Sequence, residues 1–157
     1  MAMWVAPFPG YLKVNIDASV FKGSPHFSIG MVLRDHLGEL YKARNLRRGG
    51  EVSVFEAGSL GVLEAIKWVR EIGVFNVKIE YDSLLVVQAI LKGSTNYLKV
   101  RNILQGSRVL IEDRLAIPIS FVKKQANKIA HMLERVPCEI LYSNDLSSPW
   151  RVFCIMF

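Results

Sequence analysis

The chain contains little cysteine and no long apolar run. Its two cysteines, Cys138 and Cys154, both lie near the end of a sequence of 157 residues, which excludes a disulfide framework or a zinc site. This scarcity favours an intracellular, reducing compartment, and nucleus, cytoplasm and organelle all stay open. The first ten residues lack the basic start and long apolar core of a signal peptide. No apolar run reaches the length of a membrane span, so we expect no membrane association.

The composition is that of an ordinary globular chain, with 51% apolar and 22% charged residues. A chain of this length is expected to form one domain with a hydrophobic core. We place an α/β domain at 1–135 and leave 136–157 as a C-terminal tail of uncertain structure. The net charge of +6 fits a polyanionic partner, although a solvated basic surface explains it equally well.

The first third of the domain is predicted to be an antiparallel meander. Strict alternation of apolar and polar residues predicts a strand over 12–20, with Asp17 in the middle of its polar face. A hairpin loop leads to a second strand at 28–33, and a tight turn leads to a third at 40–46.

Helices and short strands follow the meander. Ser53 and Glu56 have the spacing of a capping box, which predicts a helix running to about residue 71. The remaining elements are expected as a strand at 77–80, helices at 83–91 and 99–114, a strand at 118–123 and a last helix at 126–135. This order predicts an α/β fold with a five-stranded mixed sheet, three antiparallel strands then two parallel, flanked by helices.

Four separated polar residues stand out in this pattern: Asp17, Glu56, Asp82 and His131. Asp17 lies within an apolar strand, Asp82 ends another strand, and the other two begin helices. Carboxylates in such places cost free energy unless something compensates them. Divalent metal ions coordinated by oxygen are one such compensation, and two of them can drive phosphodiester hydrolysis.

The order and spacing of several motifs resemble the ribonuclease H-like family. The likeness is greatest to its plant-type, reverse transcriptase-like branch, which also occurs at the ends of non-LTR retroelement polyproteins. It covers nearly the whole chain and is carried by Trp4, Pro9-Gly10, Leu12–Asp17, Val32–Asp35, Gly38, Glu56-Ala57, Ile79–Ser83 and Phe121–Leu133.

This resemblance implies an enzyme that hydrolyses the RNA strand of RNA–DNA hybrids with Mg²⁺ or Mn²⁺. Asp17, Glu56 and Asp82 would be the metal-binding carboxylates, with Asp17 bridging both ions. His131 falls where many ribonucleases H have a fourth metal-binding Asp. An imidazole suits softer metals than Mg²⁺, so His131 either favours Mn²⁺ in the second site or moves protons at the leaving group.

Further residues are candidates for substrate contact. Lysines beside the last helix are expected to bind phosphates without reading sequence, and serines near the carboxylates are expected to reach the 2′-hydroxyls that distinguish RNA from DNA. The full set is Ser19, Ser53, Lys123, Lys124, Asn127 and Lys128.

Each of these residues also has a plainer interpretation. Asp17 can be a surface residue of an edge strand, Glu56 only the capping partner of its helix, and Asp82 a carboxylate favoured by a helix dipole. His131 can be a packed helical histidine. Glu80 is expected to be a solvated charge at a strand end.

Two departures from the family keep a competing hypothesis open. Ala18 stands where the family usually has Gly, and Leu84 stands where well-studied members have a Gln that contacts substrate. The alternative function is a catalytically degenerate domain that binds nucleic acid or a protein partner. In either case we expect a monomer.

Overall fold

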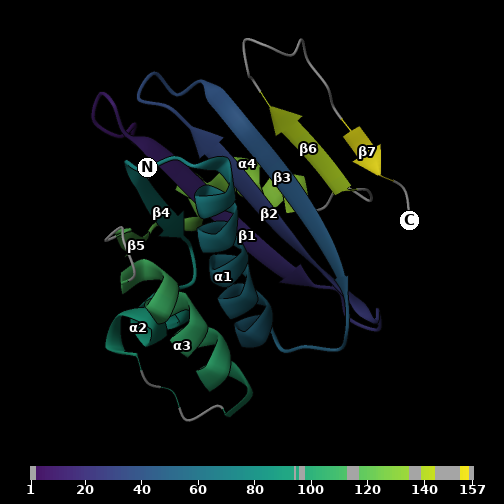
Figure 1. Cartoon of the computed structure of the whole chain (residues 1–157). Helices are drawn as coiled ribbons and strands as arrows, with labels where there is room; N and C mark the ends of the chain where they lie inside the picture. Colours follow the sequence, from purple (N-terminus) through teal and green to yellow (C-terminus); the bar gives the residue numbers. More distant parts are fainter. Residues whose placement is uncertain are drawn as a thin grey trace.

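A twisted sheet with helices on both faces organises the molecule (Figure 1). This computed structural model describes residues 3–93, 95, 98–112, 117–134, 139–143 and 153–155. The sheet has seven strands in the order β5-β4-β1-β2-β3-β6-β7. Since β1 lies between β4 and β2, Asp17 is carried by an inner strand and is not an edge residue.

The first three strands form the expected meander. They are β1 (Leu12–Val20), β2 (His26–Arg34) and β3 (Leu40–Gly49). Both pairings are antiparallel, and β2 and β3 are longer than predicted because their pairing continues to the hairpin ends. On the other side of β1, β4 (Val77–Tyr81) and β5 (Ile119–Phe121) are added in parallel. The predicted mixed sheet of three antiparallel and two parallel strands is thus confirmed.

Two strands of the C-terminal tail extend this sheet, which the sequence pattern did not predict. β6 (Glu139–Ser143) pairs antiparallel with β3, and β7 (Phe153–Ile155) pairs antiparallel with β6. They lie at the opposite edge from β5 (Figure 1). The tail therefore belongs to the same sheet as the five central strands.

Three helices cover one face of the sheet and one helix covers the other (Figure 1). α1 (Val54–Ile72), α2 (Leu84–Lys92) and α3 (Leu98–Glu112) bury the main hydrophobic core. α4 (Lys128–Glu134) packs on the opposite face, where Ala130 contacts Val32 and Ala43. The two faces carry different chemistry, because the polar residues of β1 point toward α4.

Glycines on α1 allow the helix to lie close to the sheet. A Cβ atom at Gly58 would come within 2.6 Å of Tyr81 Oη, and one at Gly61 would lie 3.3 Å from Ile16 Cγ2. The first distance is shorter than any normal contact, so only glycine fits there without a shift of the Tyr81 side chain. Gly73 ends the helix in the left-handed conformation, with φ 78°, as expected of a glycine C-cap.

The last strand and helix differ from their predicted bounds. β5 has three residues instead of the six predicted at 118–123. The predicted helix start at residue 126 falls within the 3₁₀ helix η1 (Lys124–Asn127), and the α-helix begins at Lys128. Asn127, the last residue of η1, bonds through its side chain to the backbone of β1. The predicted helix ends at residues 114 and 135 lie outside the described residues.

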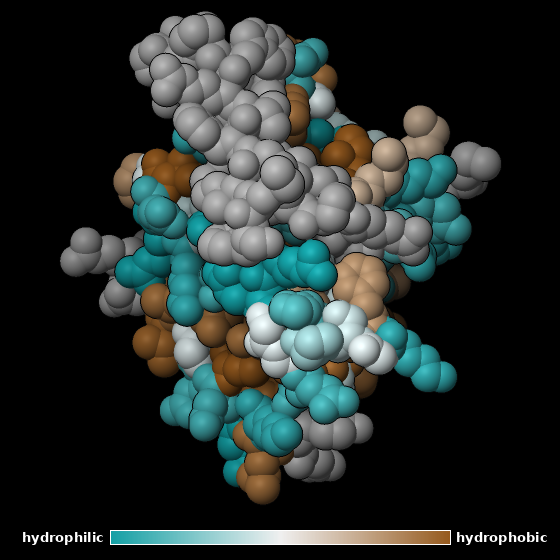
Figure 2. Space-filling model, turned by 90° about the vertical axis from the view of Figure 1, so that its right-hand side faces the viewer, coloured by the Kyte–Doolittle hydropathy of each residue, from teal (hydrophilic) through white to brown (hydrophobic). Residues whose placement is uncertain are grey.

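No helix within the described part of the chain is long and apolar enough to cross a membrane. Figure 2 views the molecule from the side on which β6 and β7 lie in Figure 1. The described surface there mixes hydrophilic and hydrophobic side chains, with a hydrophilic area near the centre of the view.

Candidate functional site

Asp17 and His131 form the centre of the candidate site. Asp17 is 7% exposed and points toward α4, where His131 Nδ1 lies 2.6 Å from Asp17 Oδ2. The other carboxylate oxygen accepts a hydrogen bond from the backbone N–H of Ala18 at 2.9 Å. Asp17 is therefore not a surface residue of an edge strand, and His131 contacts it from α4.

Asn127 connects three elements beneath this pair. Its Nδ2 donates to the carbonyl oxygen of Ile16 at 2.6 Å, and the same side chain hydrogen-bonds to Asp82. Asn127 is completely buried, and its Oδ1 has no hydrogen-bond partner among the described residues. The start of α4 is therefore fastened to β1 and to the end of β4.

Asp82 lies close enough to Asp17 for the two carboxylates to repel each other. Burial raises the pKa of Asp82 above its ordinary value, and the charge of Asp17 raises it further. The hydrogen bond from Asn127 and the positive charge of Lys124 act in the opposite direction but are weaker. A partly buried carboxylate in an unfavourable environment beside a second carboxylate is an arrangement that a cation would stabilise.

A basic cleft adjoins these carboxylates. It has a volume of about 290 Å³ and is lined by Lys124, Gln125, Lys128 and His131. Both lysines are exposed, and Lys123, at the N-cap of η1, is exposed as well. The predicted lysines therefore lie beside the carboxylates, where phosphate groups of a polyanion would be attracted.

Glu56 does not join the other carboxylates in this structure. Its Oε2 accepts from the backbone N–H of Ser53 at 2.9 Å, and Ser53 Oγ accepts from the N–H of Glu56 at 3.1 Å, which completes the predicted capping box. α1 begins on the face opposite α4 (Figure 1). Within the described residues, no group of three His, Cys, Asp or Glu side chains is placed to hold a metal ion.

The two predicted serines lie in different places. Ser19 shares the face of β1 that carries Asp17, and its Oγ is buried with no hydrogen-bond partner in the described structure. Ser53 is exposed and serves as the N-cap of α1. Ser19 therefore lies near Asp17 along the strand, whereas Ser53 lies with Glu56.

Glu80 corrects one expectation. It is 6% exposed and not solvated, because Lys13 Nζ lies 2.8 Å from its Oε1. The sequence held a signal for this pairing: Lys13 and Asn15 precede Asp17 on the polar face of β1, and Glu80 precedes Asp82 on a strand that pairs with β1. The pattern of a single strand does not reveal that Lys13 on β1 and Glu80 on β4 carry opposite charges at neighbouring positions.

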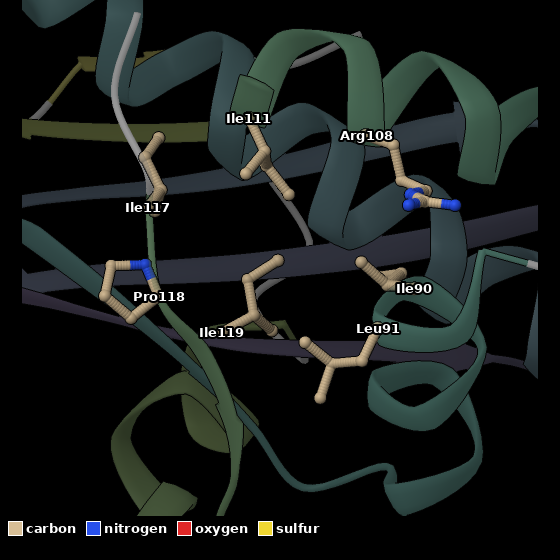
Figure 3. A pocket seen from close by; sticks show the side chains of 7 residues that line it. All are labelled: Ile90, Leu91, Arg108, Ile111, Ile117, Pro118 and Ile119. Atoms are coloured by element: carbon tan, nitrogen blue, oxygen red, sulfur yellow. The ribbon is translucent and has the colours of Figure 1, made fainter.

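A second cavity, of about 380 Å³, lies between α2, α3 and β5 and has the wrong chemistry for catalysis. Figure 3 shows its lining, which is apolar apart from the guanidinium of Arg108. Arg108 packs against Gly93, where a Cβ atom would overlap its Nη1 at 1.5 Å. Since none of the described residues that line this cavity carries a carboxylate, imidazole or hydroxyl, it is not the candidate site.

Comparison with known proteins gives a consistent picture. The model of the family described as reverse transcriptase-like matches residues 15–135, which include all the candidate residues. No curated protein matches the chain.

Solved structures share the fold at low sequence identity. Ribonuclease H1 from the halophilic archaeon Halobacterium salinarum NRC-1 is 19% identical with a TM-score of 0.70, over 78% of this chain and 93% of that chain. A ribonuclease H1 isolated from compost, LC11, solved with an RNA/DNA hybrid, is 15% identical with a TM-score of 0.70, over 78% of this chain and 92% of that chain. Prototype foamy virus protease–reverse transcriptase is 16% identical with a TM-score of 0.63, over 87% of this chain and 23% of that longer chain. The fold is ribonuclease H-like.

Proposed function

The chain belongs to the reverse transcriptase-like family, and from that premise we propose that it is a metal-dependent nuclease that hydrolyses the RNA strand of RNA–DNA hybrids. The single observation that carries the proposal is the pair of carboxylates, Asp17 and Asp82, held side by side next to a basic cleft. The relative from compost was solved with an RNA/DNA hybrid bound, which makes this class of substrate the natural one to test.

The oxygen atoms at this site fit a hard divalent cation. Asp17 and Asp82 supply two carboxylates, and Asn127 Oδ1 is a buried oxygen that no described donor satisfies. Mg²⁺ prefers such oxygen ligands. We propose that Asp17, Asp82 and Glu56 hold Mg²⁺ or Mn²⁺, with Glu56 turning out of its capping box to complete the set.

When bound, the metal would activate a water molecule and stabilise the leaving oxygen. The remaining roles belong to the chain itself. Asn127, which has no exposed surface, orients Asp82 instead of contacting substrate as the sequence suggested. Asp17 fixes the imidazole ring of His131 through the 2.6 Å contact, and this ring would bind a metal or carry a proton.

Substrate binding is assigned to the surface around the basic cleft. Lys124 and Lys128 line it, and Lys123 extends it toward β5; all three would contact phosphates. Ser19, whose Oγ has no partner among the described residues, is the better candidate for a 2′-hydroxyl contact. Ser53, which caps the start of α1, is the weaker candidate for this contact.

Two observations favour the alternative of a degenerate binding domain. In the described residues no three acidic or histidine side chains are grouped for a metal, and Leu84, 49% exposed, cannot hydrogen-bond to a substrate. Such a protein would bind nucleic acid, or a protein partner, through the same surface without cutting. We also retain in this proposal the plant-type assignment, a monomeric state and an intracellular location.

A cleavage assay on a labelled RNA–DNA hybrid tests the proposal directly. We expect cutting of the RNA strand with Mg²⁺ or Mn²⁺, none after chelation, and little cutting of double-stranded DNA. Asp17→Asn should abolish cutting while the protein remains folded, because it removes a metal-binding charge without changing side-chain volume. Cutting by Asp17→Asn at the parent rate would reject the enzyme. Binding of hybrid by both proteins without cutting would establish the alternative.

A further inference from the structure

A buried polar cluster lies beside the candidate site on the same face of the sheet. Lys13 and Glu80 form an ion pair at 2.8 Å with side chains that are 4% and 7% exposed. Lys13 also donates to the backbone oxygen of Val5. Asn15 Nδ2 donates to Glu80 Oε2 at 3.3 Å. These contacts join β1 to β4 through side chains as well as through backbone.

The cluster reaches a third strand and the N-terminal segment. Trp4 Nε1 and Arg34 Nη2 both donate to Asn15 Oδ1, at 2.8 and 3.2 Å. The Arg34 guanidinium lies 3.8 Å from the centre of the Trp4 ring. We call these residues the buried network: Trp4, Lys13, Asn15, Arg34 and Glu80.

Stability alone is a poor explanation for the buried network. Burial lowers the pKa of Arg34, and the charge of Glu80 offsets this only in part, so the environment disfavours the cation. Buried ion pairs are often no more stabilising than apolar residues of similar volume, and their better-documented use is to select one arrangement among several. A role in selecting one pairing of the strands is therefore the better explanation.

The apolar face of the strands leaves one ambiguity in the pairing of β1 with β4. Val14 and Ile16 on β1 pack beside Val77, Ile79 and Tyr81 on β4, and all five are buried. A one-residue slip would turn these side chains to the wrong face. A two-residue shift would still set apolar residues against apolar residues, so the hydrophobic pattern does not exclude it.

The buried network distinguishes the observed register of β1 and β4 from one shifted by two residues, and it does so next to the candidate site. Asn15 is paired with Glu80 in the register of β1 and β4, and each residue lies two positions before a carboxylate, Asp17 and Asp82. A two-residue shift would separate Asn15 from Glu80 and move Asp17 along β4 by about 6.5 Å. Two-metal chemistry requires ions roughly 3.5–4 Å apart, so a displacement of this size would dismantle the site.

We propose that the buried network is a positioning device that fixes the register of β1 against β4 and thereby sets Asp17 beside Asp82. The fixing of the strand register does not depend on the proposed function; only its use, to place the metal-binding carboxylates, rests on that function. The residues of the buried network would themselves contact neither substrate nor metal. This positioning device includes Trp4, which precedes β1 in the chain and acts through Asn15.

The double variant Lys13→Met/Glu80→Leu tests the positioning role. It replaces the ion pair by apolar side chains of similar size, but Arg34 loses the compensating charge of Glu80, so we expect a lower melting temperature with the fold retained. We expect Mg²⁺ and Mn²⁺ affinity, measured by calorimetry, to fall about 10–100-fold, the usual loss when residues that orient metal ligands are changed. We also expect shifted or doubled amide NMR signals for Asp17 and Asp82.

A matched control is Val62→Ala. Val62 is fully buried on α1, on the other face of the sheet. This variant should melt at a lower temperature but keep parental metal affinity and parental NMR signals at the two carboxylates. An equal fall in affinity in Val62→Ala would show that general destabilisation, and not positioning, is responsible.

Parental signals at Asp17 and Asp82 in the double variant would overturn the proposal. If the double variant does not fold, Trp4→Phe is tested in its place, because it keeps a ring over Arg34 and removes the hydrogen bond to Asn15. Unchanged amide signals of Asp17 and Asp82 and unchanged metal affinity in Trp4→Phe would also reject the positioning role. If the parent binds neither metal, the proposed function fails, and the NMR comparison still decides the role of the buried network.

Discussion

His131 and Asp17, which are 114 positions apart in the sequence, meet with Nδ1 2.6 Å from Oδ2. This contact places the first turns of α4 against the middle of β1 and brings the basic cleft to the carboxylates. The geometry of the candidate site therefore depends on how α4 packs against the sheet.

Replacing His131 separates its two proposed roles. His131→Ala should slow hybrid cleavage by about tenfold or more, since a proton carrier or ligand is removed. His131→Asp should raise the Mg²⁺-dependent rate if the position holds metal, because a hard oxygen is introduced. It should lower the rate if the imidazole donates a proton, because a carboxyl group is ionised near neutral pH. Parental rates for His131→Ala in both metals would contradict both roles.

Glu56 and Ser53 can be tested as a matched pair. Glu56→Gln keeps a residue type that suits the capping box and removes a carboxylate charge, so we expect much weaker cleavage with an almost unchanged melting temperature. Ser53→Ala should cost about 1 kcal/mol of unfolding free energy and leave cleavage nearly parental. The reverse pattern, with activity following the cap, would assign Glu56 to helix stability alone.

Two helix glycines should respond in opposite directions to alanine. Gly58→Ala should destabilise the fold by about 1–3 kcal/mol, since its Cβ atom would lie 2.6 Å from Tyr81 Oη. Gly106→Ala on α3 should stabilise it by up to about 1 kcal/mol, because the nearest atom, Leu63 Cδ1, is 3.8 Å away. Chemical unfolding of both variants measures the difference. A stabilising Gly58→Ala would contradict the close packing of α1 on the sheet.

The environment of Asp82 predicts a pH dependence of stability. Its pKa is raised above 3.8 in the folded protein, so the unfolded chain loses this proton at a lower pH. Stability therefore falls as pH rises from about 3.8 through the raised pKa, and the loss remains at higher pH. Asp82→Asn should stabilise the metal-free protein more at pH 7 than at pH 3. If Asp82→Asn changed the free energy of unfolding equally at pH 3 and pH 7, the raised pKa of Asp82 would be contradicted.

The lysines of the basic cleft should govern the salt dependence of binding. Replacing Lys123, Lys124 and Lys128 by Ala should reduce the slope of log affinity for hybrid against log salt by about one unit for each phosphate that these lysines neutralise. The matched control replaces three other exposed lysines: Lys22, Lys92 and Lys99. Equal slopes for the two triple variants would place the nucleic acid elsewhere.

Local patterns were sufficient to predict the central sheet and the start of α1. Alternation predicted β1 at its observed bounds, since a strand with one apolar and one polar face has an unambiguous period. Ser53 and Glu56 predicted the capping box because both partners lie within one helical turn. The ribonuclease H-like fold followed from the order of motifs.

Features that depend on contacts between distant segments were harder to predict. The burial of Glu80 requires Lys13 from a strand far earlier in the sequence, and no local rule supplies that partner. The same applies to β6, whose position depends on a free edge of β3. The contact of His131 with Asp17 was anticipated only from the family resemblance, because spacing alone says nothing about which face of the sheet α4 covers.

The strands contributed by the tail have a consequence for solubility. Without β6, the side of β3 that pairs with it at Lys42, Ala43 and Arg44 would be an open strand edge, and the backbone N–H and C=O groups that point to that side would lose their partners. Open edges pair readily with other chains. A fragment shortened at residue 135 would therefore be prone to self-association through β3, even though the five central strands and the candidate residues would all be retained.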